Sequence, residues 1–153
     1  MIMSFSHFIL CYSSISMETR VEPRIALLLD FQDANSLVSG VLNLKGCKVY
    51  KSKSAEDCLN LLNELEGQVD AVLVKKEIAA DGNFMLIHNI KKIAPEATSI
   101  VLTDKVDEGE NLSQHGVDEL VLTPMSAENL ADKILMMLAR RDLRIRKEKE
   151  KNM

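Results

Sequence analysis

The feature that most limits the fold is a fivefold alternation of short apolar runs with segments of helical periodicity. Apolar runs of this kind suit strands that are covered on both faces, as in parallel sheets. Five strand–helix units with short connections predict a doubly wound α/β fold with sheet order 2-1-3-4-5 and helices on both faces. The expected strands are 24–30, 47–53, 69–75, 98–104 and 117–123, and the expected helices are 33–45, 54–66, 83–94, 109–116 and 127–139.

Local signals set the ends of several helices. Ser54 with Asp57 three residues later resembles a capping box, and Ser126 is placed to cap the last helix. Gly46 and Gly67 follow helical segments and are expected to end them. Four methionines of the later helical units are expected to fill the core: Met85, Met125, Met136 and Met137.

Length and charge predict one domain with charged flanks. We expect an N-terminal extension at 1–22 without fixed structure, a domain at 23–140 and a basic helical tail at 141–153. The chain carries a net charge of −4, and residues 140–153 hold seven basic and three acidic residues, so the rest carries −4 − 4 = −8. An acidic body and only 4% aromatic residues argue against nucleic acid as a partner.

The basic tail has two interpretations. It is either a solubilising extension of the last helix or an arm that docks on an acidic partner or on a second copy. If the tail is a docking arm, removal of residues 140–153 is expected to weaken self-association or partner capture and to leave the folding midpoint unchanged.

Cysteines and the N-terminal residues bear on the compartment. Three cysteines without a C-x-x-C pair indicate a reducing compartment and no zinc site. The apolar run in residues 1–16 is too short to span a bilayer, and no positive charge precedes Arg20. We therefore expect a cytoplasmic protein without a membrane partner. A weak signal, a membrane-contact segment and a non-native extension stay open for these residues.

The carboxyl ends of the expected strands meet at one rim of the sheet, where doubly wound folds place their chemistry. The first strand ends at Leu29 and Asp30, the third at Lys75, the fourth at Thr103 and the fifth at Thr123. In the expected strand order the first and third strands are neighbours. Asp30 and Lys75 are therefore expected to face each other.

In these segments the chain resembles the receiver domain of two-component response regulators, whose fold is flavodoxin-like. The matching pieces are "RIALLLDFQD", "DAVLVKKEIAADG", "SIVLTD" and "GVDELVLTPMSAENL". No single piece is specific, but four occur in order at the family's spacing. The resemblance covers about residues 24–140 and implies a role in signal transduction.

The resemblance implies a phosphorylation site at the rim, and the chain departs from it. The family has two acids after the first strand, whereas this chain has Leu29 followed by Asp30. Lys75 occupies the position of the phosphate-accepting aspartate, and Thr123 replaces the lysine before the proline. The hydroxyl at Thr103 is kept. These five residues therefore form a degenerate phosphorylation site.

The departures remove the groups that phosphoryl transfer requires. An aspartyl phosphate needs a carboxylate nucleophile, and Mg²⁺ needs several oxygen ligands. We therefore expect no catalytic residue, no cofactor and no remaining Mg²⁺ site. The net charge of the family's site is zero, because three carboxylates are balanced by one Mg²⁺ and one lysine. The net charge here is also zero, because Asp30 is balanced by Lys75. We expect these two side chains to pair, and we expect Lys76 to be a solvated loop charge.

The expected function is that of a stand-alone receiver-like protein, a pseudo-receiver that binds other proteins without being phosphorylated. Its partner is a signalling protein of unknown identity, and a homodimer through the last two strand–helix units is the other arrangement considered. The expected partner or dimer face contains Leu120, at the family's aromatic switch position, with Pro124 and Met125.

Two alternatives stay open. The first is a phosphorelay receiver that is phosphorylated on a displaced carboxylate, for which Glu77, Asp81 and Asp104 are the candidates. The second is an enzyme on a flavodoxin-like fold, with Lys75 as a Schiff-base lysine. No glycine-rich phosphate loop follows the first strand, which argues against a nucleotide-binding enzyme.

Overall fold

A computed structural model of the chain describes residues 22–28, 37–105 and 112–151. Its centre is a parallel sheet of five strands in the order β2-β1-β3-β4-β5, which confirms the predicted topology. The strands are β1 (Arg24–Leu28), β2 (Lys48–Lys51), β3 (Ala71–Lys75), β4 (Thr98–Thr103) and β5 (Glu119–Leu122).

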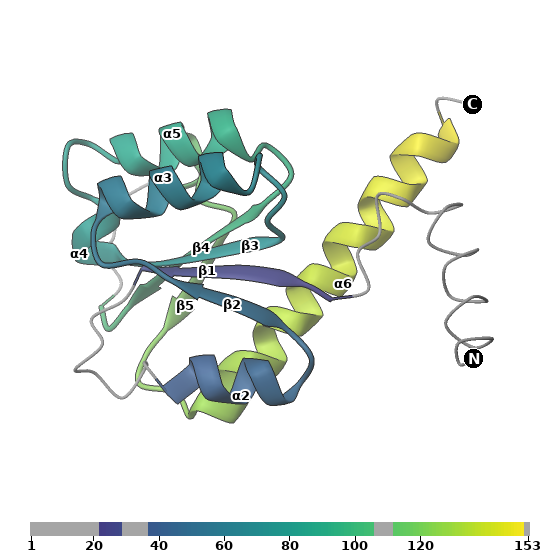
Figure 1. Cartoon of the computed structure of the whole chain (residues 1–153), viewed down its shortest axis with the longest axis horizontal. Coiled ribbons are helices and arrows are strands. Elements are labelled where there is room, and N and C mark those ends of the chain that lie inside the picture. Colours follow the sequence, from purple (N-terminus) through teal and green to yellow (C-terminus); the bar gives the residue numbers. More distant parts are fainter. Residues whose placement is uncertain (1–21, 29–36, 106–111, 152–153) are drawn as a thin grey trace.

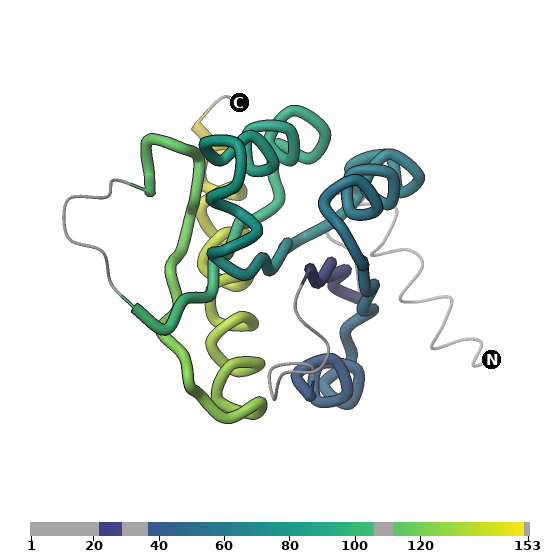
Figure 2. Tube along the Cα trace, turned by 90° about the vertical axis from the view of Figure 1, so that its left-hand side faces the viewer, coloured from purple at the N-terminus to yellow at the C-terminus, as the bar shows by residue number. Residues whose placement is uncertain are grey.

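Helices cover both faces of the sheet. In Figure 1, α3 and α5 lie above the sheet and α2 lies below it, and Figure 2 shows the same layers after a turn of 90°. The helices are α2 (Val38–Leu44), α3 (Ala55–Glu64), α4 (Lys76–Ala79), α5 (Met85–Ile93), the 3-10 helix η2 (Leu112–His115) and α6 (Ala127–Lys151).

The strand pleat divides the core into two apolar clusters, one on each face. Ile25 and Leu27 point into the cluster beneath α2 and α6, whereas Ala26 and Leu28 point into the cluster beneath α3 and α5. All six residues of β4 are buried. Central parallel strands are covered on both faces, so their apolar residues run on without polar alternation.

Two predicted helix starts are confirmed by side-chain hydrogen bonds. The backbone N–H of Asp57 donates to Ser54 Oγ at 3.1 Å, and Asp57 Oδ2 accepts from the N–H of Lys53 at 2.9 Å. Ser126 Oγ accepts from the N–H of Asn129 at 3.0 Å. These bonds satisfy amide groups that a helix N-terminus otherwise leaves without partners.

Gly67, which follows the end of α3, occupies a position that only glycine fits. Its φ is +73°, and a Cβ there would lie 2.3 Å from the carbonyl oxygen of Ile93 at the end of α5. Gly46, after α2, has a φ of +92° but open space around it. Both glycines follow a helix as predicted, and Gly67 also allows the ends of α3 and α5 to approach each other closely.

Some elements differ from the expectation. Residues 76–79 form a short helix, so Lys76 is the first residue of a helix and not a loop charge as expected. Two methionines expected in the core are exposed, Met85 by 56% and Met136 by 61%, because the buried stripes of α5 and α6 leave them on the outward face. Of the expected helix at 109–116, the described part contains only η2.

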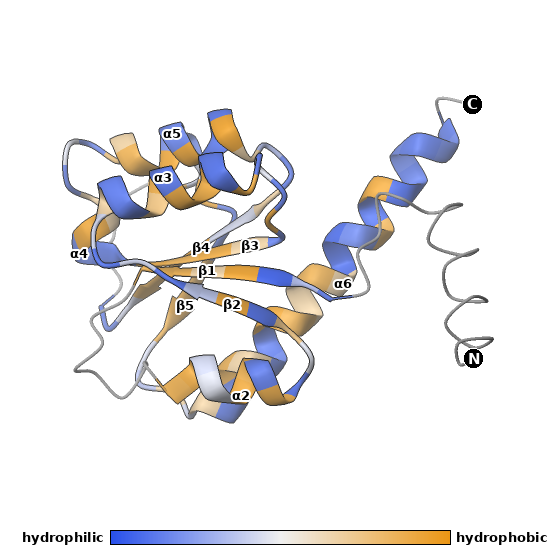
Figure 3. Cartoon of the chain, viewed as in Figure 1, coloured by the Kyte–Doolittle hydropathy of each residue, from blue (hydrophilic) through white to orange (hydrophobic). Residues whose placement is uncertain are grey.

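Helix α6 joins the expected helix at 127–139 to the expected helical tail, and it crosses from one layer to the other. It has 25 residues, which corresponds to about 37 Å. It begins beside α2, where Lys45 Nζ lies 3.0 Å from Asp132 Oδ1, and then rises past the amino ends of the strands (Figures 1 and 2). Figure 3 shows that its second half is largely hydrophilic.

Candidate functional site

The register of the sheet brings the carboxyl ends of the strands to one edge, as the sequence predicted. Leu28 pairs with Val74, Lys75 pairs with Leu102, and Thr103 pairs with Leu122. This edge is the candidate rim. Two of its predicted members, Leu29 and Asp30, lie outside the described residues, so the Asp30–Lys75 pair stays a prediction.

Lys75 is the last residue of the central strand β3. Its backbone is extended, with φ −69° and ψ 140°, and it is the N-cap residue of α4 without capping through its side chain. Its residue surface is half-buried, and it takes part in a polar or charge interaction, as Lys76 does. A cationic side chain therefore stands at the middle of the rim.

The hydroxyl of Thr103 is engaged within its own loop. Thr103 is 5% exposed. Its Oγ1 donates to the carbonyl oxygen of Lys105 at 2.8 Å and accepts from the N–H of Lys105 at 3.1 Å. Both hydrogen-bonding roles of the hydroxyl are therefore occupied, and a ligand at the rim would have to displace these local bonds.

The end of β5 carries the predicted partner face. Leu120 is 37% exposed and Pro124 is exposed, but Met125 is half-buried against the core cluster beneath α2 and α6. Leu122, which the sequence prediction did not include, is 50% exposed. Thr123 is half-buried at the junction to the cis bond with Pro124, and its N–H donates to the carbonyl oxygen of Thr103 at 2.8 Å.

The acids considered for a displaced phosphorylation site are all at the surface. Glu77 lies in the first turn of α4, Asp81 follows that helix, and Asp104 follows β4. Each is exposed, and no group of three metal-ligating side chains occurs in 22–28, 37–105 and 112–151. The Mg²⁺ that the resemblance implies would need Asp30, so its predicted loss stays a prediction.

A second polar cluster lies at the opposite, amino end of the sheet. Asp70 precedes β3 directly, and its Oδ1 accepts from Arg141 Nη2 at 2.8 Å while its Oδ2 accepts from the N–H of Arg24 at 2.8 Å. Arg141 Nη1 donates to the carbonyl oxygen of Asp70 at 2.8 Å. Arg141 Nη2 also lies 2.6 Å from Asp142 Oδ1. These contacts fasten the middle of α6 to the central strands.

The Asp70–Arg141 pair is nearly buried, with side chains 9% and 11% exposed. Burial disfavours the charged guanidinium, but the hydrogen bonds and charges of Asp70 and Asp142 outweigh that effect and raise the pKa of Arg141. The pair argues against the expectation that removal of 140–153 leaves the folding midpoint unchanged, because the cut would take Arg141 away from the nearly buried Asp70.

No family model matches the chain, and no curated protein matches it in sequence. Solved structures of receiver domains do match. A receiver domain protein of Methanospirillum hungatei JF-1 has a TM-score of 0.68 at 17% identity, with 80% of this chain and 98% of that chain covered. One from Clostridium thermocellum gives 0.66 at 22% identity, covering 79% and 98%. A response regulator from Thermotoga maritima gives 0.67 at 19% identity, covering 78% and 99%.

These neighbours are response regulator receiver domains, and at such identities the likeness establishes the fold alone. The chain therefore has the CheY-like, flavodoxin-like receiver fold that the sequence predicted. In a separate respect, none of the helices in the described ranges is both long and apolar enough to cross a bilayer.

Proposed function

We propose that the chain is a receiver-like signalling protein, a pseudo-receiver, that acts by binding other proteins and without being phosphorylated. One observation carries the proposal: a lysine, Lys75, ends the central strand at the position where the resemblance puts the phosphate-accepting aspartate. An ammonium group cannot form an acyl phosphate, and it repels a divalent cation.

The surroundings of Lys75 support this proposal. The Thr103 hydroxyl, which the family keeps at this rim, is bonded to the backbone of Lys105. Lys75 itself already takes part in an interaction. A rim at which Thr103 and Lys75 already have partners suits a binding surface that does not change with phosphorylation. Such a surface requires neither Mg²⁺ nor another cofactor.

Incubation with acetyl phosphate and Mg²⁺, followed by intact mass measurement, tests the proposal. The native chain should gain no phosphate. Lys75→Asp restores a carboxylate at the acceptor position and is the matched variant, because it changes only that group. A phosphate on the native chain would contradict the proposal.

A phosphorylated native chain would favour the displaced-carboxylate alternative. Fragment masses would then locate the phosphate, and substitution of the labelled acid should abolish it. Asp81→Asn and Glu77→Gln are the first variants to compare, because both acids are exposed within a few residues of Lys75.

We infer that the partner face lies on β5, where Leu120 and Leu122 are exposed side by side on the strand. Alternate strand residues point to the same face, and Val101 and Thr103 are their partners on β4. The exposed fractions are 37% for Leu120 and 50% for Leu122. They suit an apolar protein partner, either a second copy or another signalling protein.

Light scattering of Leu122→Lys and of the native chain tests the homodimer. A dimer through β5 should dissociate in the variant. Leu44→Lys on α2, where the leucine is 89% exposed, is the matched control and should change nothing. Equal molar masses for all three chains, each that of a monomer, would contradict the homodimer and leave a different signalling protein as the partner.

A further inference from the structure

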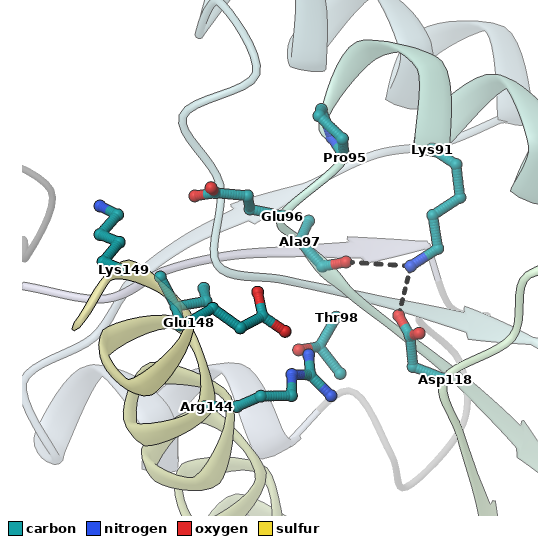
Figure 4. Close-up of a pocket in the computed structure, with 10 residues that line it drawn as sticks. Lys91, Pro95, Glu96, Ala97, Thr98, Asp118, Arg144, Glu148 and Lys149 are labelled. Carbon is teal, nitrogen blue, oxygen red and sulfur yellow. Dashed lines mark hydrogen bonds and ion pairs between the residues drawn. The ribbon is translucent and has the colours of Figure 1, made fainter. Parts of the chain in front are cut away.

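A polar cleft of about 510 Å³ lies at the amino ends of the strands, at the end of the sheet opposite to the rim. One wall is the end of α5 with the segment that leads into β4, and the other wall is the second half of α6 (Figure 4). The side chains that line it and matter below are Lys91, Glu96, Thr98, Asp118, Arg144, Ile145, Glu148 and Lys149.

The two walls are fixed relative to each other. Arg141, one turn before the lining residues of α6, is bonded to Asp70 at the start of β3 and lies 3.4 Å from the carbonyl oxygen of Glu96. Lys91 forms an ion pair with Asp118, whose Oδ2 also accepts from the N–H of Ser99 at 2.8 Å. The cleft is therefore bounded by groups that already have partners.

Four other polar groups of the cleft have no hydrogen-bond or ion-pair partner. Among the described residues, Arg144, Glu148 and Glu96 make no side-chain hydrogen bond or ion pair. Thr98 is only 7% exposed, and its hydroxyl likewise has no partner there. In Figure 4, Arg144 and Glu148 point from α6 toward Thr98. The Thr98 hydroxyl is not among the buried side-chain groups that lack a partner, so it is accessible from the cleft, and Arg144 and Glu148 are exposed beside it. These three groups offer hydrogen-bonding capacity that a polar ligand would use.

The charges of the lining select the class of ligand. Three basic residues, Lys91, Arg144 and Lys149, oppose three acidic residues, so the lining is neutral. A phosphate would meet as much repulsion as attraction, and so would a simple cation. An uncharged ligand would not use the exposed charges of Arg144 and Glu148. A ligand that carries both signs within a few ångströms avoids these costs.

We propose that this cleft binds a small zwitterion of the α-amino acid class. The guanidinium of Arg144 matches a carboxylate in two parallel hydrogen bonds, and Thr98 adds its hydroxyl. Glu148, one turn further along α6, accepts the ammonium group. Ile145 supplies an apolar surface for the side chain of the ligand. The site goes beyond the proposed function and does not depend on it, because it lies away from Lys75 and β5.

Amide NMR spectra recorded during titration of the full chain with free amino acids test this site. We expect one or more of the standard amino acids, leucine among the first probes, to shift the amide signals of Thr98 and Ile145 at millimolar concentration. Two matched compounds remove one charge each from leucine: 4-methylpentanoate lacks the ammonium group and 3-methylbutylamine lacks the carboxylate. Each should bind at least about tenfold more weakly than leucine.

Substitutions locate the binding. Arg144→Gln should weaken the binding of the best amino acid by at least about tenfold, and Thr98→Val by about threefold. Arg146→Gln is the matched control, because Arg146 is exposed on the same helix and does not line the cleft. The proposal is overturned if no amino acid shifts the cleft signals, if inorganic phosphate or 4-methylpentanoate binds as tightly, or if the two arginine variants behave alike.

Discussion

The two ends of the sheet use charge in different ways. At the carboxyl end the central strand stops at Lys75, and the nearby Thr103 hydroxyl is bonded to the backbone of its own loop. At the amino end the same strand is preceded by Asp70, which is held by Arg141 in a nearly buried ion pair. Doubly wound folds usually keep their chemistry at the carboxyl end, whereas the nearly buried ion pair of this chain lies at the amino end.

This difference shows that the fold does not depend on the residues at the rim. The core clusters and the strand register are those of a receiver-like fold, and they do not depend on which residue ends β3. A lysine at that position is therefore compatible with the fold. The amino-end network, in contrast, binds the last helix to the central strand, so its loss should be felt throughout the domain.

The largest effect is expected at the amino end. Arg141→Ala removes the guanidinium that pairs with the nearly buried carboxylate of Asp70, and it should lower the free energy of unfolding by about 3–5 kcal/mol. Urea denaturation measures the change. Arg140→Ala, on the exposed face of the same helix, should cost less than about 0.5 kcal/mol. Similar losses in the two variants would mean that the pair is not a structural anchor.

The next effect appears at alkaline pH. Cys58 is fully buried, and burial raises the pKa of its thiol from an ordinary value of 9.0 to about 11. The unfolded chain loses this proton first, so stability is complete below about pH 9 and falls as the pH rises toward 11, by about 2–3 kcal/mol. Denaturation at a series of pH values measures the slope. The Cys58→Ala variant should show a shallower decline, and an identical decline would exclude the thiol as its source.

The comparison at the rim uses two neighbouring lysines. If Lys75 pairs with Asp30, Lys75→Ala should cost about 1–3 kcal/mol, because the charge of a half-buried lysine is screened less than that of an exposed one. Lys76→Ala should cost less than about 0.5 kcal/mol. Thermal or urea unfolding of both variants checks the difference. Equal costs would show that Lys75 holds no special position at the rim.

The smallest effect should follow from removal of the exposed end of α6. Residues 146–151 are all exposed, so a chain that ends at Ile145 should lose less than about 0.5 kcal/mol. A chain that ends at Ala139 loses Arg141 and should be destabilised about as much as Arg141→Ala. A large loss on the shorter cut would place further stabilising contacts beyond Ile145.

The sequence predicted what depends on neighbours along the chain. The five strands follow from apolar runs, and the starts of α3 and α6 follow from the caps at Ser54 and Ser126. The pair of Asp70 and Arg141 joins residues 71 positions apart, so no local pattern reveals it. One signal was available: Asp70 stands directly before a buried strand, and a buried carboxylate requires a cation or several donors.

For the candidate rim, the sequence predicted which residues come together but not how their side chains are bonded or exposed. The strand pattern placed Lys75 and Thr103 at one edge, and the register confirms it. The direction of the Thr103 hydroxyl depends on the turn that follows β4, which periodicity does not encode. The exposure of Leu122 depends on what packs over the end of β5, which helical periodicity along the chain does not encode.

The glycine after α3 limits how this sequence can vary over evolutionary time. Any side chain at position 67 would press on the backbone of Ile93, and a backbone atom cannot turn aside as a side chain can. A single substitution there must therefore wait for a prior change that moves the end of α5. Gly46, with open space around it, carries no such condition. In a library of random variants, position 67 should tolerate glycine alone, while position 46 should accept asparagine as well.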